Sequence, residues 1–251
     1  MNWIYFSHYF LVIIIITICL YNYYVNSQKA PICLSPTLDT ADHMANNSVR
    51  LYKGNQYWDL IGLPDRVGFL RSPKQQPIVW ENFGKLSHRT HVVSCFTGNR
   101  RGYVYKFEGN RLWAWSTSAA QWIGGKDGQQ FKLMPTDADP TNGFDIVFHN
   151  GLKDNPQLIA MIGNKVYYYS TKQYYITLAE DTEASGHPNG KYGENFPTGV
   201  DAAFSWPSDD GNGYLIFFFK KDKYCFRKDK LESGKECDEW RDSRELFGCN
   251  N

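Results

Sequence analysis

The sequence lacks the short motifs that mark the common hydrolase and zinc sites. No histidine is followed by glutamate, so the HExxH helix of a metalloproteinase is absent, and no GxSxG segment presents a serine nucleophile. No two cysteines are spaced as CxxC, which argues against a structural zinc site. A formal net charge of +1 supplies no bulk field for nucleic acid or a membrane surface. We therefore expect a protein that is not an enzyme, binds no nucleic acid and recognises its partner locally.

Charged residues are also missing from the N-terminus. The first 25 residues contain no Lys, Arg, Asp or Glu, and the apolar run from Phe10 to Leu20 has the length of a signal-peptide core. Val25 and Ser27 fit the small-residue rule for cleavage, so residues 1–27 are predicted to be a signal peptide and the protein to be secreted and extracellular. The basic n-region is missing, and the alternative is an uncleaved anchor, which would give the chain its only membrane contact.

Five cysteines remain after the leader: Cys33, Cys95, Cys225, Cys237 and Cys249. An odd number in an oxidising compartment leaves at least one thiol free or paired with another chain. Asn46 begins a glycosylation sequon, Asn-Asn-Ser, which fits the same compartment.

The chain repeats one β-rich unit four times. Aromatic residues make up 16% of the chain, which favours strands. RLYKGNQYWDL, YKFEGNRLWAW, AMIGNKVYYYS and FFFKKDKYCFR align on Gly54, Gly109, Gly163 and Lys221, which are 55, 54 and 58 residues apart. Gly-Asn pairs at such turns tolerate positive φ, so each copy is predicted to be a hairpin.

A unit of about 50 residues cannot bury both faces of its sheet alone. Four such sheets placed around an axis would bury one another, so the repeat predicts an all-β, four-bladed propeller, with a β-sandwich as the alternative. The predicted domain covers residues 33–249, with blades at about 33–86, 87–138, 139–195 and 196–249. A bridge between Cys33 and Cys249 would join the first blade to the last and stabilise the fold by about 5 kcal/mol.

These residues resemble the hemopexin-like repeat family, which includes hemopexin, the C-terminal domains of matrix metalloproteinases and vitronectin. VDAAF followed by YLIFFFKKDKYCFR is similar to its blade pattern, as is LYKGNQYWDL with GLP soon after, and Cys33 with Cys249 resembles its ring-closing pair. The resemblance covers nearly the whole chain after the leader.

The resemblance implies a central tunnel that holds a cation, calcium or sodium, on backbone carbonyls. The matching positions are Asp39, Val93, Asp145 and Asp201. Val93 departs from the acidic pattern, which removes a local negative charge but keeps a carbonyl. The alternative is that the aspartates only start strands and accept hydrogen bonds from turn amides.

The same alignment bears on the remaining thiols. It aligns Cys95 with Ala203 of the fourth copy and Val147 of the third, which indicates a small, buried position and an unpaired thiol. Cys225 stands where other copies carry tryptophan, and Cys237 lies in the next predicted strand. A Cys225–Cys237 disulfide is one expectation, and pairing of either residue outside the chain is the other.

Haem is the sharpest ligand hypothesis, because imidazole can bind its iron. The candidate ligands are His88 and His91, in the segment SHRTH, and His187 in a long polar loop. The competing interpretation is that all three are solvated loop histidines.

The sequence therefore predicts a secreted, non-enzymatic binding protein whose partner is an extracellular protein or a matrix component. A carrier of haem or another small ligand is the second hypothesis. A non-catalytic relative or regulator of matrix metalloproteinases is the third. The oligomeric state stays open.

Overall fold

The computed structural model describes residues 31–43, 48–54, 56–61, 78–79, 90–95, 103–116, 121–123, 129–130, 142–149, 157–170, 177–178, 187–188, 196–207, 214–228, 237 and 239–249. The predicted leader, Asn46 and His88 lie outside these residues, as do the side chains of Cys95 and His187. No helix in the described part of the chain is long and apolar enough to cross a membrane.

The predicted hairpin turns form at all four positions. Gly54, Gly109 and Gly163 have φ of 61°, 55° and 58°, and Lys221 has φ of 55°. Glycine has no Cβ and adopts this left-handed conformation at little cost, whereas lysine is strained there. Each turn joins two long antiparallel strands.

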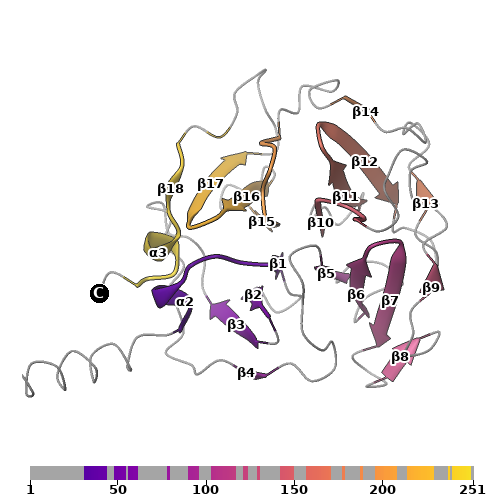
Figure 1. The fold of residues 1–251 in the computed structure, drawn as a ribbon, viewed down its shortest axis with the longest axis horizontal. Coiled ribbons are helices and arrows are strands. Elements are labelled where there is room, and N and C mark those ends of the chain that lie inside the picture. The colour runs from indigo at the N-terminus through magenta and orange to yellow at the C-terminus, as the bar shows by residue number, and fades with distance from the viewer. Residues whose placement is uncertain are drawn as a thin grey trace, which may run out of the picture.

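The strands form four separate antiparallel sheets, visible in Figure 1 as four groups around a common centre. The first sheet contains β1 (Thr40–His43), β2 (Ser48–Lys53), β3 (Gln56–Ile61) and β4 (Ile78–Val79). The second contains β5 (Thr90–Cys95), β6 (Tyr103–Glu108), β7 (Arg111–Ser116), β8 (Gln121–Ile123) and β9 (Gln129–Gln130).

The other two sheets repeat this order. The third contains β10 (Ile146–His149), β11 (Gln157–Ile162), β12 (Lys165–Ser170), β13 (Thr177–Leu178) and β14 (His187–Pro188). The fourth contains β15 (Ala202–Pro207), β16 (Tyr214–Lys220), β17 (Lys223–Lys228) and β18 (Arg241–Asp242). The first strand of every sheet lies nearest the centre, where β1, β5, β10 and β15 contact one another.

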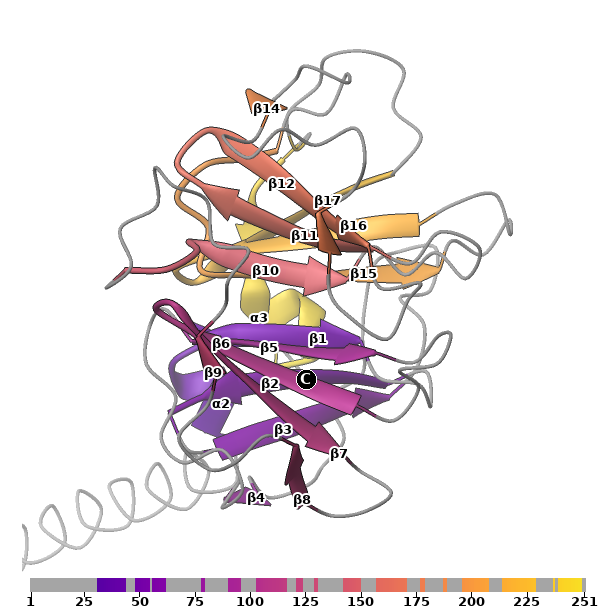
Figure 2. The ribbon, with the colours of Figure 1, turned by 90° about the vertical axis from the view of Figure 1, so that its right-hand side faces the viewer.

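Apolar side chains fill the spaces between sheets. Phe148 and Phe218, from the third and fourth sheets, meet edge to face with ring centroids 6.1 Å apart. Trp58 and Phe217 share a cluster between the first and fourth sheets. Between the first and second sheets the apolar cluster is small, with only Tyr52, Val92 and Val104 buried among the described residues. Figure 2 shows the second and third sheets side-on, each a twisted stack of strands.

These observations correct the predicted architecture. The all-β class is present, but the prediction of a closed four-bladed propeller is wrong. Among the described strands every pairing lies within one sheet, and none joins a sheet to its neighbour. The four sheets are separate units that pack on one another through side chains, because their strand-to-strand backbone pairing stays inside each sheet. The predicted blade boundaries stay a prediction.

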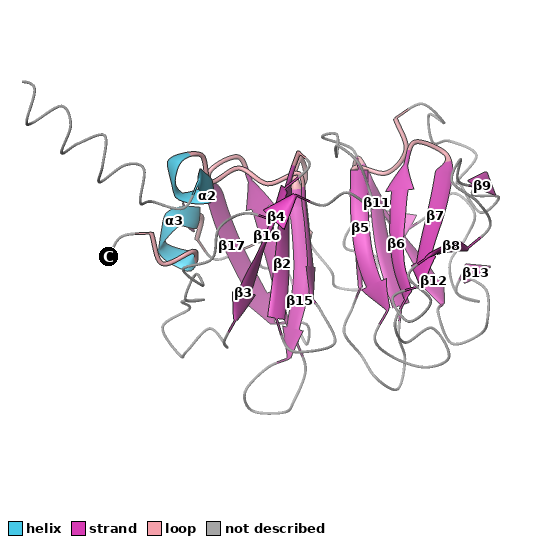
Figure 3. Ribbon diagram, turned by 90° about the horizontal axis from the view of Figure 1, so that it is seen from below, coloured by secondary structure: helices cyan, strands magenta, loops and turns pink. Residues whose placement is uncertain are grey.

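Two disulfides are present among the described residues. Cys33 and Cys249 are joined with Cα atoms 5.5 Å apart, and Cys225 and Cys237 with Cα atoms 5.6 Å apart. The first joins Cys33 of the short helix α2 (Pro31–Leu34) to Cys249, three residues after the short helix α3 (Ser243–Leu246), at opposite ends of the described chain. Figure 3 shows both helices together beside β17.

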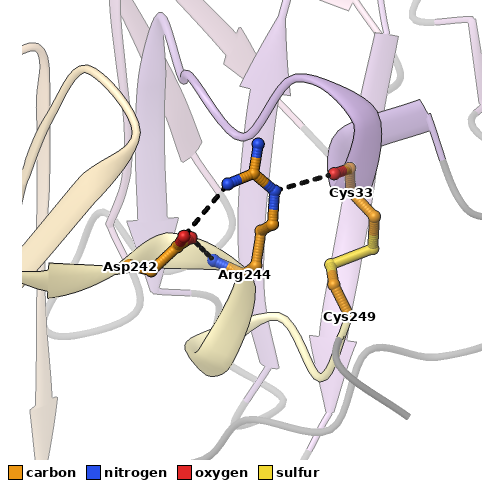
Figure 4. A network of polar contacts seen from close by, with 4 residues as sticks. All are labelled: Cys33, Asp242, Arg244 and Cys249. Atoms are coloured by element: carbon orange, nitrogen blue, oxygen red, sulfur yellow. Dashed lines mark hydrogen bonds and ion pairs between the residues drawn. A yellow bond between two sulfur atoms is a disulfide. The ribbon is translucent and has the colours of Figure 1, made fainter.

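Polar contacts support the link between α2 and α3 (Figure 4). Asp242 caps α3, because its Oδ1 accepts a hydrogen bond from the Arg244 amide at 2.8 Å. The Arg244 guanidinium donates to Asp242 Oδ2 at 3.0 Å and to the Cys33 carbonyl at 3.3 Å. The arginine therefore bridges the C-terminal helix to the N-terminal one next to the disulfide.

Candidate binding site at the first strands

Three aspartates stand just before the first strands and hold the hairpin turns of their own sheets. The Oδ2 atoms of Asp39, Asp145 and Asp201 accept hydrogen bonds from the amides of Gly54, Gly163 and Lys221, each at 2.6 Å. A charged acceptor makes these bonds stronger than neutral ones. Each aspartate therefore ties the start of its sheet to a turn whose backbone has positive φ.

The second sheet has threonine at this position. Thr90 is paired with Glu108, the residue before Gly109. In the other three sheets, Asp39, Asp145 and Asp201 likewise lie opposite the residues that precede their turns. Val93 lies three residues further along β5, buried between the second and third sheets. The predicted alignment of the second copy is thus corrected by three residues.

The same shift of three residues changes which residues of the other copies are equivalent to Cys95. Val92, and not Cys95, takes the place of Val147 and Ala203 in the other sheets. Cys95 is the last residue of β5, paired with Tyr103.

The three hydrogen bonds are those expected if the aspartates serve the turns. The cation prediction concerned backbone carbonyls, and it stays a prediction. Within the ranges given above, no group of three or more His, Cys, Asp or Glu side chains is placed to hold a metal ion.

The opposite end of the first strands carries histidine. His43 and His149 are the last residues of β1 and β10, each four positions after the aspartate of its sheet, and each is 4% exposed. In the fourth sheet Ser205 takes this position, and its Oγ donates a hydrogen bond to the His149 carbonyl at 2.6 Å. The His43 ring lies 4.7 Å from the Trp206 ring, at an interplanar angle of 32°.

Burial keeps both imidazoles neutral at pH 7. Removal from water lowers the pKa of His43 from 6.5 to about 4. Burial also lowers the pKa of His149 to about 4, and repulsion from His43 contributes, so the two rings interact electrostatically.

His91, a predicted haem ligand, lies elsewhere on the first strands. It is 1% exposed, and its Nε2–H donates a hydrogen bond to the Phe144 carbonyl at 2.8 Å. This bond joins the second sheet to the segment that enters the third. His187 belongs to β14, at the edge of the third sheet. The structure therefore does not bring these two candidates together, because β5 is a central strand and β14 an outer one.

A charged pair that the sequence analysis did not single out lies on the first sheet. Arg50 binds Asp59 through Nε and Nη2, at 2.6 and 2.9 Å, and its guanidinium lies 4.2 Å from the centroid of the Tyr57 ring. Burial is the largest single influence and lowers the pKa of Arg50, but the Asp59 carboxylate together with Tyr52 and Tyr57 outweighs burial and raises that pKa. Arg50 and Asp59 lie directly opposite each other on β2 and β3. Counting residues outward from the predicted turn would therefore have predicted this pair.

No family model matches the sequence, and no curated protein matches it. Solved structures do resemble the fold. A hemopexin fold protein, CP4, from cow pea has a TM-score of 0.57 at 14% identity, over 84% of this chain and 96% of its own. A plant albumin from Cicer arietinum that shows hemagglutination has a TM-score of 0.57 at 15% identity, over 85% and 96%. A 2S albumin seed protein from Dolichos has a TM-score of 0.55 at 15% identity, over 84% and 96%.

These comparisons correct the predicted family. Assignment to the hemopexin-like repeat family of hemopexin, matrix metalloproteinases and vitronectin is wrong, because no family model matches and the three similar structures named above are plant proteins, two of them albumins. At 14–15% identity the likeness is one of fold alone.

Proposed function

We propose that this chain is a secreted, non-enzymatic binding protein whose partner is an extracellular protein or a matrix component. The observation that carries the proposal is the use of its reactive side chains. The carboxylates of Asp39, Asp145 and Asp201 hold turn amides, and His91 holds a backbone carbonyl. These carboxylates and this imidazole, which could act in catalysis, are instead used to hold the backbone. A scaffold held in this way suits recognition through loops and strand edges.

Two further facts support this proposal. Two disulfides fit an oxidising compartment, where such bonds persist. One protein of similar fold shows hemagglutination, which requires attachment to the outside of cells. Recognition of an extracellular surface is therefore the function that we assign.

The test is direct binding of the purified, disulfide-intact chain from Gln28 onward. Collagen, fibronectin, laminin and heparan sulfate are immobilised separately, and agglutination of red cells is scored in parallel. We expect saturable binding to at least one surface. The matched control is the same protein reduced and alkylated, which keeps the composition but loses both cystines. Absence of saturable binding in every arm, together with no agglutination, would refute the proposal.

Two added arms separate the alternative functions. Titration with haem would give a saturable Soret shift for a haem carrier and a featureless, non-saturating signal for the function proposed here. Immobilised matrix metalloproteinases test a regulatory role, and inhibition of a protease without binding to any matrix surface would favour that role instead.

A further inference from the structure

We propose that the junction between the first and second sheets binds a neutral hexose of an extracellular glycan. The junction is formed by the facing sides of β2 and β3 in the first sheet and β6 and β7 in the second. The inference rests on the proposed function, since it names the chemistry of the extracellular surface that the chain would recognise.

This junction buries little apolar surface. The three other clusters of the described residues contain between nine and fifteen buried residues each, whereas this one contains three. Tyr57 of β3 and Trp115 of β7 pack against these three residues and are themselves only half-buried. Figure 1 shows the two sheets next to each other. One ring from each sheet therefore lies at the junction and still reaches solvent.

An ion pair lies beside the ring of the first sheet. Arg50 is two residues before Tyr52 on β2, and Asp59 is opposite Arg50 on β3. Residues two apart share a face of a strand, so the pair lies on the face that carries Tyr52 and Tyr57. The Arg50 and Asp59 side chains are 20% and 23% exposed. The Arg50 guanidinium lies 4.2 Å from the centroid of the Tyr57 ring.

The second sheet repeats this combination. Val104 and Trp115 are opposite each other, and Lys106 and Trp113 form the next pair on the same face. The Lys106 Nζ lies 4.7 Å from the centroid of the Trp113 ring and 2.9 Å from Oε2 of Glu108. A cation, a carboxylate and a half-buried ring from each sheet thus flank the small apolar cluster.

The charges on these faces cancel, which indicates an uncharged ligand. Three cations and three carboxylates belong to the two faces: Arg50, Lys106, Arg111, Asp42, Asp59 and Glu108. A sulfated chain would need an excess of cations, because the field of paired charges does not attract it. The junction therefore suits a neutral sugar and not an anionic one.

The rings and the ion pair fit the two kinds of surface that a sugar presents. The C–H groups of a hexose can pack on aromatic rings, and its hydroxyl groups both donate and accept hydrogen bonds. A guanidinium carries more N–H donors than the two that Arg50 uses on Asp59, and a carboxylate accepts more hydrogen bonds than two. The pair can therefore donate to one hydroxyl and accept from its neighbour.

The experiment is isothermal titration calorimetry of the disulfide-intact chain with neutral trisaccharides of glucose, galactose, mannose or N-acetylglucosamine. Heparin is the sulfated probe and is added as a competitor. We expect saturable binding of at least one neutral trisaccharide, which heparin does not displace. Tyr57→Ala and Asp59→Asn should each weaken this binding more than about tenfold.

The matched control is Phe226→Ala. Phe226 is also half-buried, packs against an apolar cluster and lies beside an arginine, with the Arg241 guanidinium 5.7 Å from its ring centroid. It belongs to the fourth sheet, so this variant should bind the trisaccharide as the parent does.

A measurement on the unaltered chain keeps the test valid if a variant fails to fold. In NMR spectra the indole N–H signals of Trp113 and Trp115 should shift when the trisaccharide is added. Those of Trp58 and Trp206, buried in the cluster between the first and fourth sheets, should stay in place.

The inference is overturned if no neutral trisaccharide binds, if heparin displaces it, or if the Trp113 and Trp115 signals do not move. It is also overturned if folded Tyr57→Ala and Asp59→Asn chains bind as the parent does. Any of these results, together with saturable binding to a matrix protein, leaves the proposed function standing. Absence of binding to every surface and every sugar refutes both.

Discussion

Acid should destabilise this protein through His43 and His149. Both histidines are buried, and both pKa values are lowered from 6.5 to about 4. The unfolded chain binds protons at these residues below pH 6.5, whereas the folded chain resists protonation until about pH 4. The free energy of unfolding therefore falls as the pH drops through this window, and their stabilising contribution is intact above pH 6.5.

The magnitude follows from linkage. One pKa unit corresponds to about 1.4 kcal/mol, so at pH 5 each histidine removes about 2 kcal/mol relative to pH 7, and the pair about 4 kcal/mol. Substituting both residues with glutamine removes the titrating groups. The double variant should be less stable than the parent at pH 7.5 because packing is disturbed, but it should lose about 4 kcal/mol less between pH 7.5 and pH 5.

The assay is urea unfolding of the disulfide-intact chain at both pH values, followed by circular dichroism. Carboxylates also titrate in this range, so the quantity to compare is the pH-dependent loss in the parent minus the loss in the variant. An NMR titration of the histidine Hε1 signals should show His43 and His149 unprotonated at pH 5.5. Equal losses in parent and variant, or a histidine that titrates near pH 6.5, would refute the reasoning.

Three further changes test the scaffold. Replacing Cys33 and Cys249 together by serine should lower the free energy of unfolding by about 5 kcal/mol, since the bond closes a loop of 216 residues; an unchanged thermal midpoint in the variant would contradict this. Gly143→Ala should cost about 3 kcal/mol in urea unfolding, because the new Cβ would lie 2.7 Å from a backbone oxygen. Gly163→Ala is the control, because Gly163 has a similar φ and no atom lies within 4 Å of the new Cβ, so this change should cost only about 1 kcal/mol. Equal losses of unfolding free energy in the two variants would show that the close approach at Gly143 is absent. Lys221→Gly should raise the thermal midpoint by relieving about 1 kcal/mol of backbone strain, and a lower midpoint would show that the lysine side chain stabilises the turn.

Local signals in the sequence predicted the local structure well. The Gly-Asn pairs and the aromatic segments after them marked three hairpins, and the periodic spacing identified the fourth at Lys221 although it lacks glycine. This succeeded because a tight turn depends on the residues within it. The Cys33–Cys249 disulfide was also predictable, because the two cysteines lie at opposite ends of the repeats.

The register of the second copy was harder to predict. Asp39, Asp145 and Asp201 precede their turn residues by 15, 18 and 20 positions, because the connection between the first two strands varies in length. Thr90 precedes Gly109 by 19 positions and Val93 by 16, so both spacings fit. With an aspartate absent, no local feature separated the two alignments, and the apolar VVSCF segment favoured the wrong one.

The two ends of the first strands illustrate why fold and site differ in how far a sequence reveals them. At the turn end, an aspartate binds an amide of its own sheet, so the contact is encoded within one repeat. At the other end, His43 and His149 come from different sheets, and their relative position depends on how those sheets pack. The segments LDTADH and FDIVFH do carry the shared position of the two histidines, because each histidine lies four residues after its aspartate. What the segments lack is the fact that β1 and β10 touch across the centre, which arises only when all four sheets are in place. A feature made by packing between repeats therefore cannot be predicted from the sequence of one repeat.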